Sequence, residues 1–248
     1  MLEKMAGIKH LTNYSFSGCG FLLPYHLGVA NVLQNQSLLD KQTSNLAGAS
    51  GGAIMAAGLA TNISIQDMFT QVKDMAAYCR KHGTVWKLEK YLRDILNESL
   101  PSNSVQLMGN RVTIATTQIY PKPEICFYNS FLSKEDVVEA IVASCFIPSY
   151  ISPAPLLRYR EGWHCDGGLI KIVPDLNNYI KVCVFYQDIF GSSNFDISPN
   201  LLQSSRYTNN QLLRYALLPP SENMLKKLFQ QGEETAVLWG EEKIKKNV

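Results

Sequence analysis

The stretch SNLAGASGGAIMAAGLA, residues 44–60, decides the fold of this chain. It opens with a short apolar run typical of a buried strand and closes with an alanine-rich run typical of a helix. Between the two runs, Gly48, Ser50 and Gly52 match the pattern G-x-S-x-G. In a strand-to-helix turn this pattern indicates a nucleophile elbow, where small neighbours let the strand and the helix pass closely. A tight turn around an ordinary serine would give the same letters.

The preceding stretch, SFSGCGFLLPYHLGVANVL at residues 15–33, repeats the order of strand, glycine turn and helix. Residues 13–16 read as a short buried strand, and the apolar spacing after Pro24 is helical. Strands that alternate with helices predict an α/β sheet covered on both sides.

The glycine turn of this second unit has two interpretations. Acyl transfer through Ser50 needs backbone N–H donors for the oxyanion, and Gly18, Cys19 and Gly20, with Gly51, are candidates to supply them. The alternative is a dinucleotide-binding loop. It is disfavoured because a leucine stands where the third glycine of G-x-G-x-x-G belongs.

Local signals place further elements. Ser64 with Asp67, and Ser133 with Asp136, are capping pairs that predict two helix starts, and Gly83 should end the first of these helices. Residues 88–96 predict a third helix, which we expect to end at Pro101. Runs rich in β-branched and aromatic residues predict strands at residues 111–117, 124–129 and 179–186. The tail from residue 224 predicts a helix with one apolar face, which we expect to contact a lipid surface.

Composition bounds the class of protein. The chain has 248 residues, 46% of them hydrophobic, and a formal charge of +2, so it can bury one sizeable core and has no basic stripe for nucleic acid. Residues 11–39 lack charged side chains, but polar residues interrupt them too often for a membrane span.

The cysteines and the N-terminus indicate the compartment. Six cysteines lie 18 to 60 residues apart without a C-x-x-C motif or a histidine pair at metal spacing, so we expect reduced thiols and no metal site. The first residues show no apolar core of a signal peptide, which favours a cytoplasmic setting.

A serine nucleophile needs a base. The usual order is serine, acid, histidine, yet the last histidine is His164, and Asp136, which precedes it, belongs to a helix cap. The stretch CDGGL, residues 165–169, instead puts the carboxylate of Asp166 beside two glycines. A Ser50/Asp166 dyad fits this pattern, although an aspartate that only caps a turn would also produce it.

Several motifs, in this order and spacing, resemble the patatin-like phospholipase family, in particular its adipose triglyceride lipase and adiponutrin branch. They are SFSGCGFLLPYHLGV, GASGGA, VASCFIPSY and WHCDGGL. Segments further on, FGSSNFDISPN, RYALLPPSE and LKKLFQQGEETAVLW, are similar to those that follow the catalytic core in that branch. The length is most similar to that of its short members.

The resemblance implies one patatin-like domain over residues 1–248, with a catalytic core at about 11–178 and a helical extension at about 200–245. It implies a three-layer α/β/α fold with a mostly parallel central sheet. It also implies Ser50 as nucleophile, Asp166 as base, and Gly18, Cys19 and Gly20 around the oxyanion. The resemblance implies that this chemistry proceeds without a metal or cofactor.

The implied substrates are acylglycerols or phospholipids, cleaved as by a triacylglycerol lipase or a phospholipase A2, in contact with a membrane or lipid-droplet surface. An acyltransferase on the same dyad and a non-catalytic lipid-binding protein of the same fold remain alternatives. The sequence gives no indication of a protein activator.

Two stretches depart from the branch. Ile170, Lys171 and Ile172 replace the small polar residues usual after D-G-G, and Leu23 and Pro24 stiffen the start of a helix. If Lys171 points inward, it would lower the pKa of Asp166 and weaken the base; the alternative is that it points into solvent.

Overall fold

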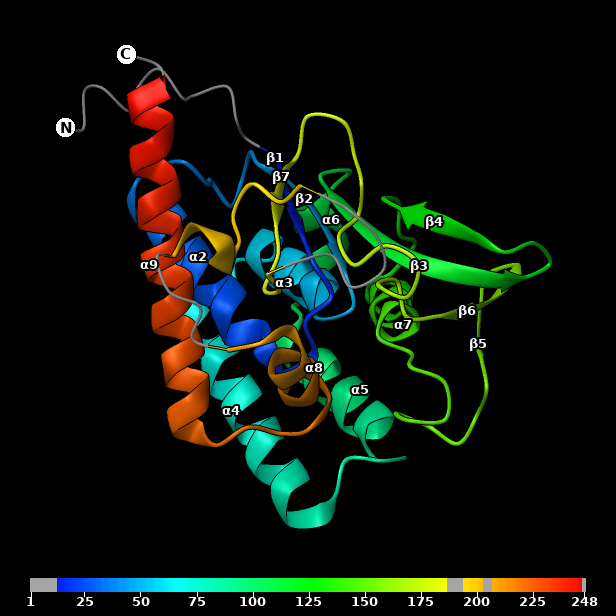
Figure 1. Cartoon of the computed structure of the whole chain (residues 1–248). Helices are drawn as coiled ribbons and strands as arrows, with labels where there is room; N and C mark the ends of the chain where they lie inside the picture. The colour runs from blue at the N-terminus through cyan, green and yellow to red at the C-terminus, as the bar shows by residue number, and fades with distance from the viewer. Residues whose placement is uncertain (1–12, 187–193, 203–206, 247–248) are drawn as a thin grey trace.

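The computed structural model describes residues 13–186, 194–202 and 207–246 (Figure 1). Residue His10, residues 11–12 of the expected core and part of the FGSSNFDISPN segment lie outside this range. Within it, the strands form one seven-stranded mixed sheet in the order β5-β6-β3-β2-β1-β7, with β4 paired to β3. Their bounds are β1 Asn13–Phe16, β2 Asn45–Ala49, β3 Val112–Tyr120, β4 Glu124–Tyr128, β5 Leu157–Tyr159, β6 Gly162–Cys165 and β7 Ile180–Val182.

Helices connect and follow these strands. They are the 3-10 helices η2 Gly20–Leu22 and η3 Pro199–Leu201, and the α-helices α2 Leu23–Asn35, α3 Gly51–Ala60, α4 Ile65–His82, α5 Leu88–Ser99, α6 Ser104–Met108, α7 Lys134–Ser144, α8 Asn209–Leu217 and α9 Glu222–Lys246. Pro24 lies in the first turn of α2, where its missing N–H costs no hydrogen bond.

The parallel part of the sheet positions the glycine turns. Strands β7, β1, β2 and β3 are parallel neighbours, whereas β4, β5 and β6 pair antiparallel. Phe16 pairs with Gly48, so β1 and β2 end side by side and their loops emerge at one edge. Both β2 and the first part of β3 are buried continuously, as expected for strands covered on both faces. The architecture is therefore the three-layer α/β/α fold that the sequence predicts.

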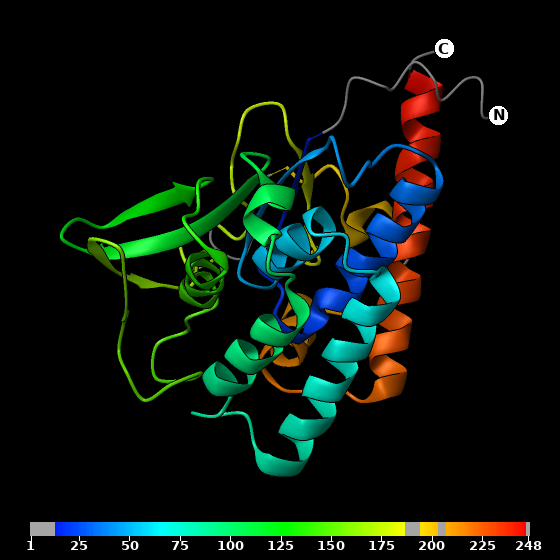
Figure 2. The same cartoon turned by 180° about the vertical axis from the view of Figure 1, so that it is seen from behind.

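Helices cover the sheet in a fixed arrangement. α3 packs against β1, β2 and β3, and α7 packs against β3, β5 and β6. α2 contacts α3, α4 and α9, and Figure 2 shows α4 and α5 as neighbours on the far side of the molecule. None of the helices within the described residues is long and apolar enough to cross a lipid bilayer.

Helix α9 packs along α2, and a glycine on each helix allows the two backbones to approach closely (Figure 1). A Cβ on Gly28 would lie 2.0 Å from the carbonyl oxygen of Phe229, and one on Gly232 would lie 2.1 Å from that of Tyr25. The apolar face of α9 is buried here, with Leu225 and its neighbours fully covered. The prediction that this face contacts lipid is therefore wrong, because α2 already occupies it.

Most local predictions hold. The hydroxyls of Ser64 and Ser133 accept hydrogen bonds from the amides of the third helical residues, and Gly83 ends α4 with φ +85°. The strand predicted at residues 179–186 is shorter than expected: β7 runs only from Ile180 to Val182. Its ladder with β1 ends at the pair Phe16 and Val182, and beyond it only an isolated bridge to Ile197 is present among the described residues.

Candidate active site

Ser50 lies at the sharp turn between β2 and α3. Its φ of 53° is in the left-handed region, which a non-glycine residue occupies at a cost and usually for a functional reason. A Cβ on Gly48 would lie 2.0 Å from the carbonyl oxygen of Gly52, and one on Gly52 would lie 2.3 Å from that of Phe16. The two flanking glycines are therefore required by the close approach of strand and helix.

The glycine loop after β1 faces this turn. A Cβ on Gly51 would lie 2.4 Å from Cys19 Sγ, which shows how closely the loop meets the start of α3. The amide of Gly18 donates to the carbonyl of Ile172 at 2.7 Å, so this amide already has an acceptor. Across the part of the chain that the structure describes, the amides of Cys19, Gly20 and Gly51 have no acceptor. These three, at the positive end of the α3 dipole, are the donors left for an anion.

Asp166 follows β6 and reaches the same place. The backbone holds it through its amide, which donates to the Phe146 carbonyl at 2.7 Å, and its carbonyl, which accepts from Thr117 Oγ1 at 2.9 Å. A Cβ on Gly18 would lie 3.5 Å from Ser50 Cβ and 3.7 Å from Gly168 Cα. The fold thus brings the predicted serine, aspartate and glycine loop together from three distant segments.

The carboxyl group of Asp166 is only half satisfied. Its Oδ1 accepts from the amide of Gly168 at 2.8 Å, whereas Oδ2 is buried and has no hydrogen-bond partner among the described residues. Burial raises the pKa of Asp166 to about 6, against the opposing effects of the Ser50 hydroxyl and the Gly168 amide. At neutral pH the carboxylate is mostly ionised, and it is more basic than an exposed aspartate.

Ser144 joins the two halves of the site, a role that the sequence analysis missed. Its hydroxyl accepts from the amide of Ser50 at 2.8 Å and donates to the carbonyl of Ala115 at 2.6 Å. Its own carbonyl accepts from the amide of Gly167 at 2.9 Å. The only signal in the sequence was its place in the VASCFIPSY motif.

The histidines take no part in this cluster. None of the three that the structure describes lines the cleft beside Ser50. His164 is buried, its Nδ1 lies 2.9 Å from Thr116 Oγ1, and burial lowers the pKa of its ring. Burial also lowers the pKa of His26 to about 4, and its ring bonds to Ser17. Both histidines are therefore neutral packing residues at pH 7.

Lys171 points away from the aspartate. Its Nζ forms an ion pair with Asp175 Oδ2 at 2.6 Å, and its side chain is 45% exposed. The pKa of Asp166 is raised rather than lowered. The idea that Lys171 weakens the base is therefore wrong, and the solvent-facing alternative is the one observed.

A cleft of about 250 Å³ opens beside Ser50 and Asp166. Apolar side chains form most of its wall, including Leu169 and Ile172 from the loop after the aspartate and Leu213 from α8. α8 packs directly against the glycine loop: a Cβ on Gly20 would lie only 2.2 Å from the carbonyl oxygen of Ala216. The C-terminal extension thus supplies one wall of the site. Within the described residues, no group of three His, Cys, Asp or Glu side chains could hold a metal ion.

These groups match the needs of acyl transfer from an ester. A hydroxyl on a strained turn, a buried carboxylate of raised pKa and three unpaired amides surround an apolar cleft. Residues 14–174 match the family model described as patatin-like phospholipase. The chain belongs to the patatin-like phospholipase family.

Curated relatives support this assignment. The chain is 31% identical over 244 residues to the human 1-acylglycerol-3-phosphate O-acyltransferase PNPLA3, covering 92% of this chain and 50% of that protein. It is 30% identical to mouse patatin-like phospholipase domain-containing protein 2, covering 89% of this chain and 48% of that protein. It thus spans about half the length of these relatives. Human patatin-like phospholipase domain-containing protein 4 is 29% identical, with 93% of this chain and 96% of that protein covered.

A solved structure shows the same fold. VipD from Legionella pneumophila superposes with a TM-score of 0.54 at 12% sequence identity, over 94% of this chain and 67% of that one. At this identity the likeness concerns the fold alone. The family and the α/β/α fold that the sequence motifs predict are both confirmed.

Proposed function

We propose that this patatin-like protein is a lipid acyl hydrolase of the triacylglycerol lipase or phospholipase A2 type, with Ser50 as nucleophile and Asp166 as general base. The observation that carries the proposal is the unpaired, buried Oδ2 of Asp166, whose carboxyl group has a pKa raised to about 6. A base needs a free lone pair and a pKa near the working pH, and this oxygen offers both.

The mechanism follows from the positions of the groups. The Ser50 hydroxyl attacks the ester carbonyl carbon while Asp166 accepts its proton. The amides of Cys19, Gly20 and Gly51 stabilise the oxyanion. When this tetrahedral intermediate breaks down, the alcohol leaves and takes the proton from Asp166. A water then attacks the acyl-serine while the same carboxylate accepts its proton. The carboxyl group returns this proton to Ser50 Oγ as the C–O bond of the acyl-serine breaks and the fatty acid leaves.

The substrates would be acylglycerols or phospholipids at a lipid surface. The cleft wall is apolar, and two of its leucines, Leu169 and Leu213, are 46% and 39% exposed. Ile170 and Leu218, next in sequence to lining residues, are 44% and 50% exposed. Such side chains can dip into a membrane or a lipid droplet and bring the ester to Ser50. We propose a cytoplasmic protein that binds these surfaces peripherally, without a cofactor.

Acyl transfer to an alcohol is the second candidate. Relatives with such names include human PNPLA3, named as an acyltransferase, and the human omega-hydroxyceramide transacylase, which is 27% identical over 91% of this chain. The first half of the mechanism is the same, and only the acceptor of the acyl group differs.

Product analysis separates the candidates. Purified protein is incubated with emulsified trioleoylglycerol or phosphatidylcholine, with and without monooleoylglycerol as acceptor, and its products are compared with those of Ser50→Ala. Free fatty acid that disappears in the variant supports the hydrolase. Diacylglycerol that forms from phosphatidylcholine only when monooleoylglycerol is present supports the transferase, because hydrolysis of trioleoylglycerol also releases diacylglycerol. Equal products from both proteins would refute the serine mechanism and leave the non-catalytic alternative.

A further inference from the structure

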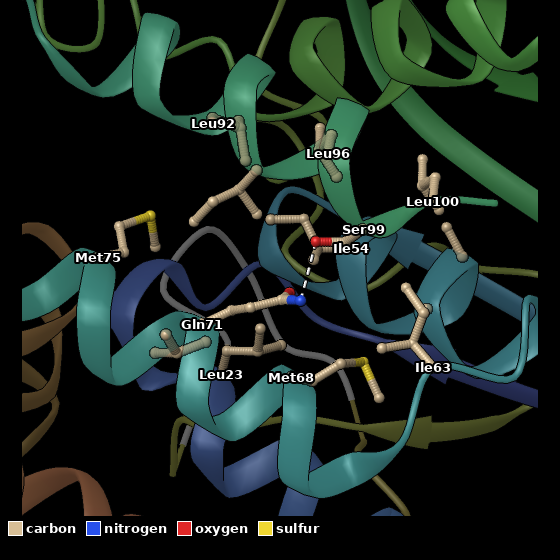
Figure 3. Close-up of a pocket in the computed structure, with 14 residues that line it drawn as sticks. Leu23, Ile54, Ile63, Met68, Gln71, Met75, Leu92, Leu96, Ser99 and Leu100 are labelled. Atoms are coloured by element: carbon tan, nitrogen blue, oxygen red, sulfur yellow. Dashed lines mark hydrogen bonds between the residues drawn. The ribbon is translucent and has the colours of Figure 1, made fainter.

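Two apolar pockets lie behind the cleft, and each shares lining residues with the next. The outer pocket, of about 60 Å³, adjoins Ser50 and shares Gly20, Ile147 and Leu217 with the cleft. The inner pocket, of about 40 Å³, lies between α3, α4 and α5 (Figure 3).

Three side chains line both pockets. They are Ile54 from α3, Met75 from α4 and Leu92 from α5. Because the pockets meet at these side chains, the three form a constriction between them. Figure 3 shows Met75 and Leu92 on facing helices at one end of the inner pocket.

One face of α3 forms a continuous floor from the serine inward. Ser50 and Ile54, and then Ala57 and Gly58, are spaced as neighbours on one side of a helix, and all four line a pocket. At a rise of 1.5 Å per residue, the track from Ser50 to Gly58 is about 12 Å long. It begins at the proposed nucleophile and ends inside the core.

The chemistry of the walls selects the occupant. No charged side chain lines either pocket among the described residues. The two polar side chains of the inner pocket, Gln71 and Ser99, bond to each other: Gln71 Nε2 donates to Ser99 Oγ at 2.8 Å across the space between α4 and α5 (Figure 3). A ligand without hydrogen-bonding groups therefore does not break this hydrogen bond when it binds in the inner pocket. A methylene chain fits these walls, and Met68 and Met75 can shift to admit it because methionine side chains adapt readily.

We propose that the acyl chain of the substrate runs from Ser50 past Ile54, Met75 and Leu92 into the inner pocket, and that these three residues set the chain length accepted. The inference rests on the proposed acyl hydrolase function and specifies its acyl site. The wider cleft, with the exposed Leu169 and Leu213 at its mouth, is left for the rest of the lipid.

Two variants shorten the track at different depths. Ile54→Phe narrows the constriction. Gly58→Ala fills the inner pocket, because its Cβ would lie 2.5 Å from Met68 Sδ and would push that flexible side chain into the space. Gly240→Ala on α9 is the matched control: it is also a glycine-to-alanine change within a helix, and its Cβ would lie 3.3 Å from Gln36 Oε1.

The readout is the ratio of kcat/KM for a dodecanoyl ester to that for a butyryl ester of the same alcohol. Each methylene kept out of an apolar pocket lowers the rate by about fourfold. We expect the ratio to fall by about tenfold or more in Ile54→Phe and by about fourfold in Gly58→Ala, and to stay unchanged in Gly240→Ala. Melting curves identify any variant that fails to fold.

A binding assay makes the test independent of turnover. Each change is added to Ser50→Ala, and binding of dodecanoate is measured by calorimetry. Weaker binding in both track variants, but not in Gly240→Ala, supports the acyl path even if the wild type hydrolyses neither ester, in which case the proposed function alone fails. Hydrolysis with an unchanged ratio, or dodecanoate binding unaffected by both track variants, would overturn the path.

Discussion

Replacing Asp166 by asparagine should stabilise the fold while it abolishes turnover. Burial raises the pKa of this carboxyl group to about 6 from an ordinary value of 3.8. A shift of about 2 units corresponds to about 3 kcal/mol of unfavourable free energy for the buried carboxylate at neutral pH. Asparagine keeps an acceptor for the Gly168 amide but buries an NH₂ group in place of Oδ2, so we expect a net gain of about 2 kcal/mol. For a chain of this size the melting temperature should rise by about 4–8 °C.

The pH dependence of this gain is the sharper test. Below about pH 3 the wild-type carboxyl group is protonated in both the folded and the unfolded states, so the two proteins should be nearly equally stable. Between about pH 4 and pH 6 the unfolded state has released the proton while the folded state still holds it, so the wild type loses stability over this window; the gap between the two proteins opens there and levels off above about pH 6. Melting curves from about pH 3 to 8 measure it.

Asp175→Asn is the control of opposite sign. Hydrogen bonds from Lys171 and Lys181 lower the pKa of this exposed carboxyl group to about 2. It therefore contributes stability above its unfolded pKa, and its removal should not stabilise the protein at neutral pH. An Asp166→Asn protein that is less stable than wild type at pH 7.5, or a gap that does not change with pH, would refute the reasoning.

Three further predictions concern the same site. The acid limb of the kcat/KM profile should have a midpoint near pH 6, because only ionised Asp166 accepts the serine proton, and a midpoint near 4 in the measured profile would contradict the buried-base account. Ser144→Ala leaves the Ser50 amide and the Ala115 carbonyl without their buried partner, so it should cost about 1–3 kcal/mol by urea denaturation and also slow turnover. In ester assays, His164→Ala should slow turnover only a few-fold, whereas Asp166→Asn should lose about 10³-fold; equal losses would favour a histidine base.

Sequence patterns predicted the elements whose signals are local. The capping pairs at Ser64 and Ser133 fix their helix starts within a few residues, and the small residues around Ser50 identify the sharp turn. The CDGGL pattern suggested Asp166 as the partner of Ser50 but left a turn-capping aspartate as an alternative, and the family resemblance implied the dyad, because spacing along the chain does not reveal which loops meet in space.

The remaining features depend on tertiary contacts that leave no local pattern. The ladder of β7 with β1 ends at the pair Phe16 and Val182, and the apolar face of α9 is covered because two glycines admit α2. Ser144 is one serine among many until its hydroxyl is seen between Ser50 and Ala115. The contribution of α8 to the cleft likewise depends on its contact with Gly20.

Covalent labelling tests the central claim most directly. The protein is treated with an alkyl fluorophosphonate at several pH values, and the modified residue is located by mass spectrometry. The account predicts one adduct, on Ser50, formed at a rate that rises through about pH 6 and falls by about 10³-fold in Asp166→Asn. No adduct on Ser50, or labelling at the same rate in Asp166→Asn, would contradict a dyad of Ser50 and Asp166.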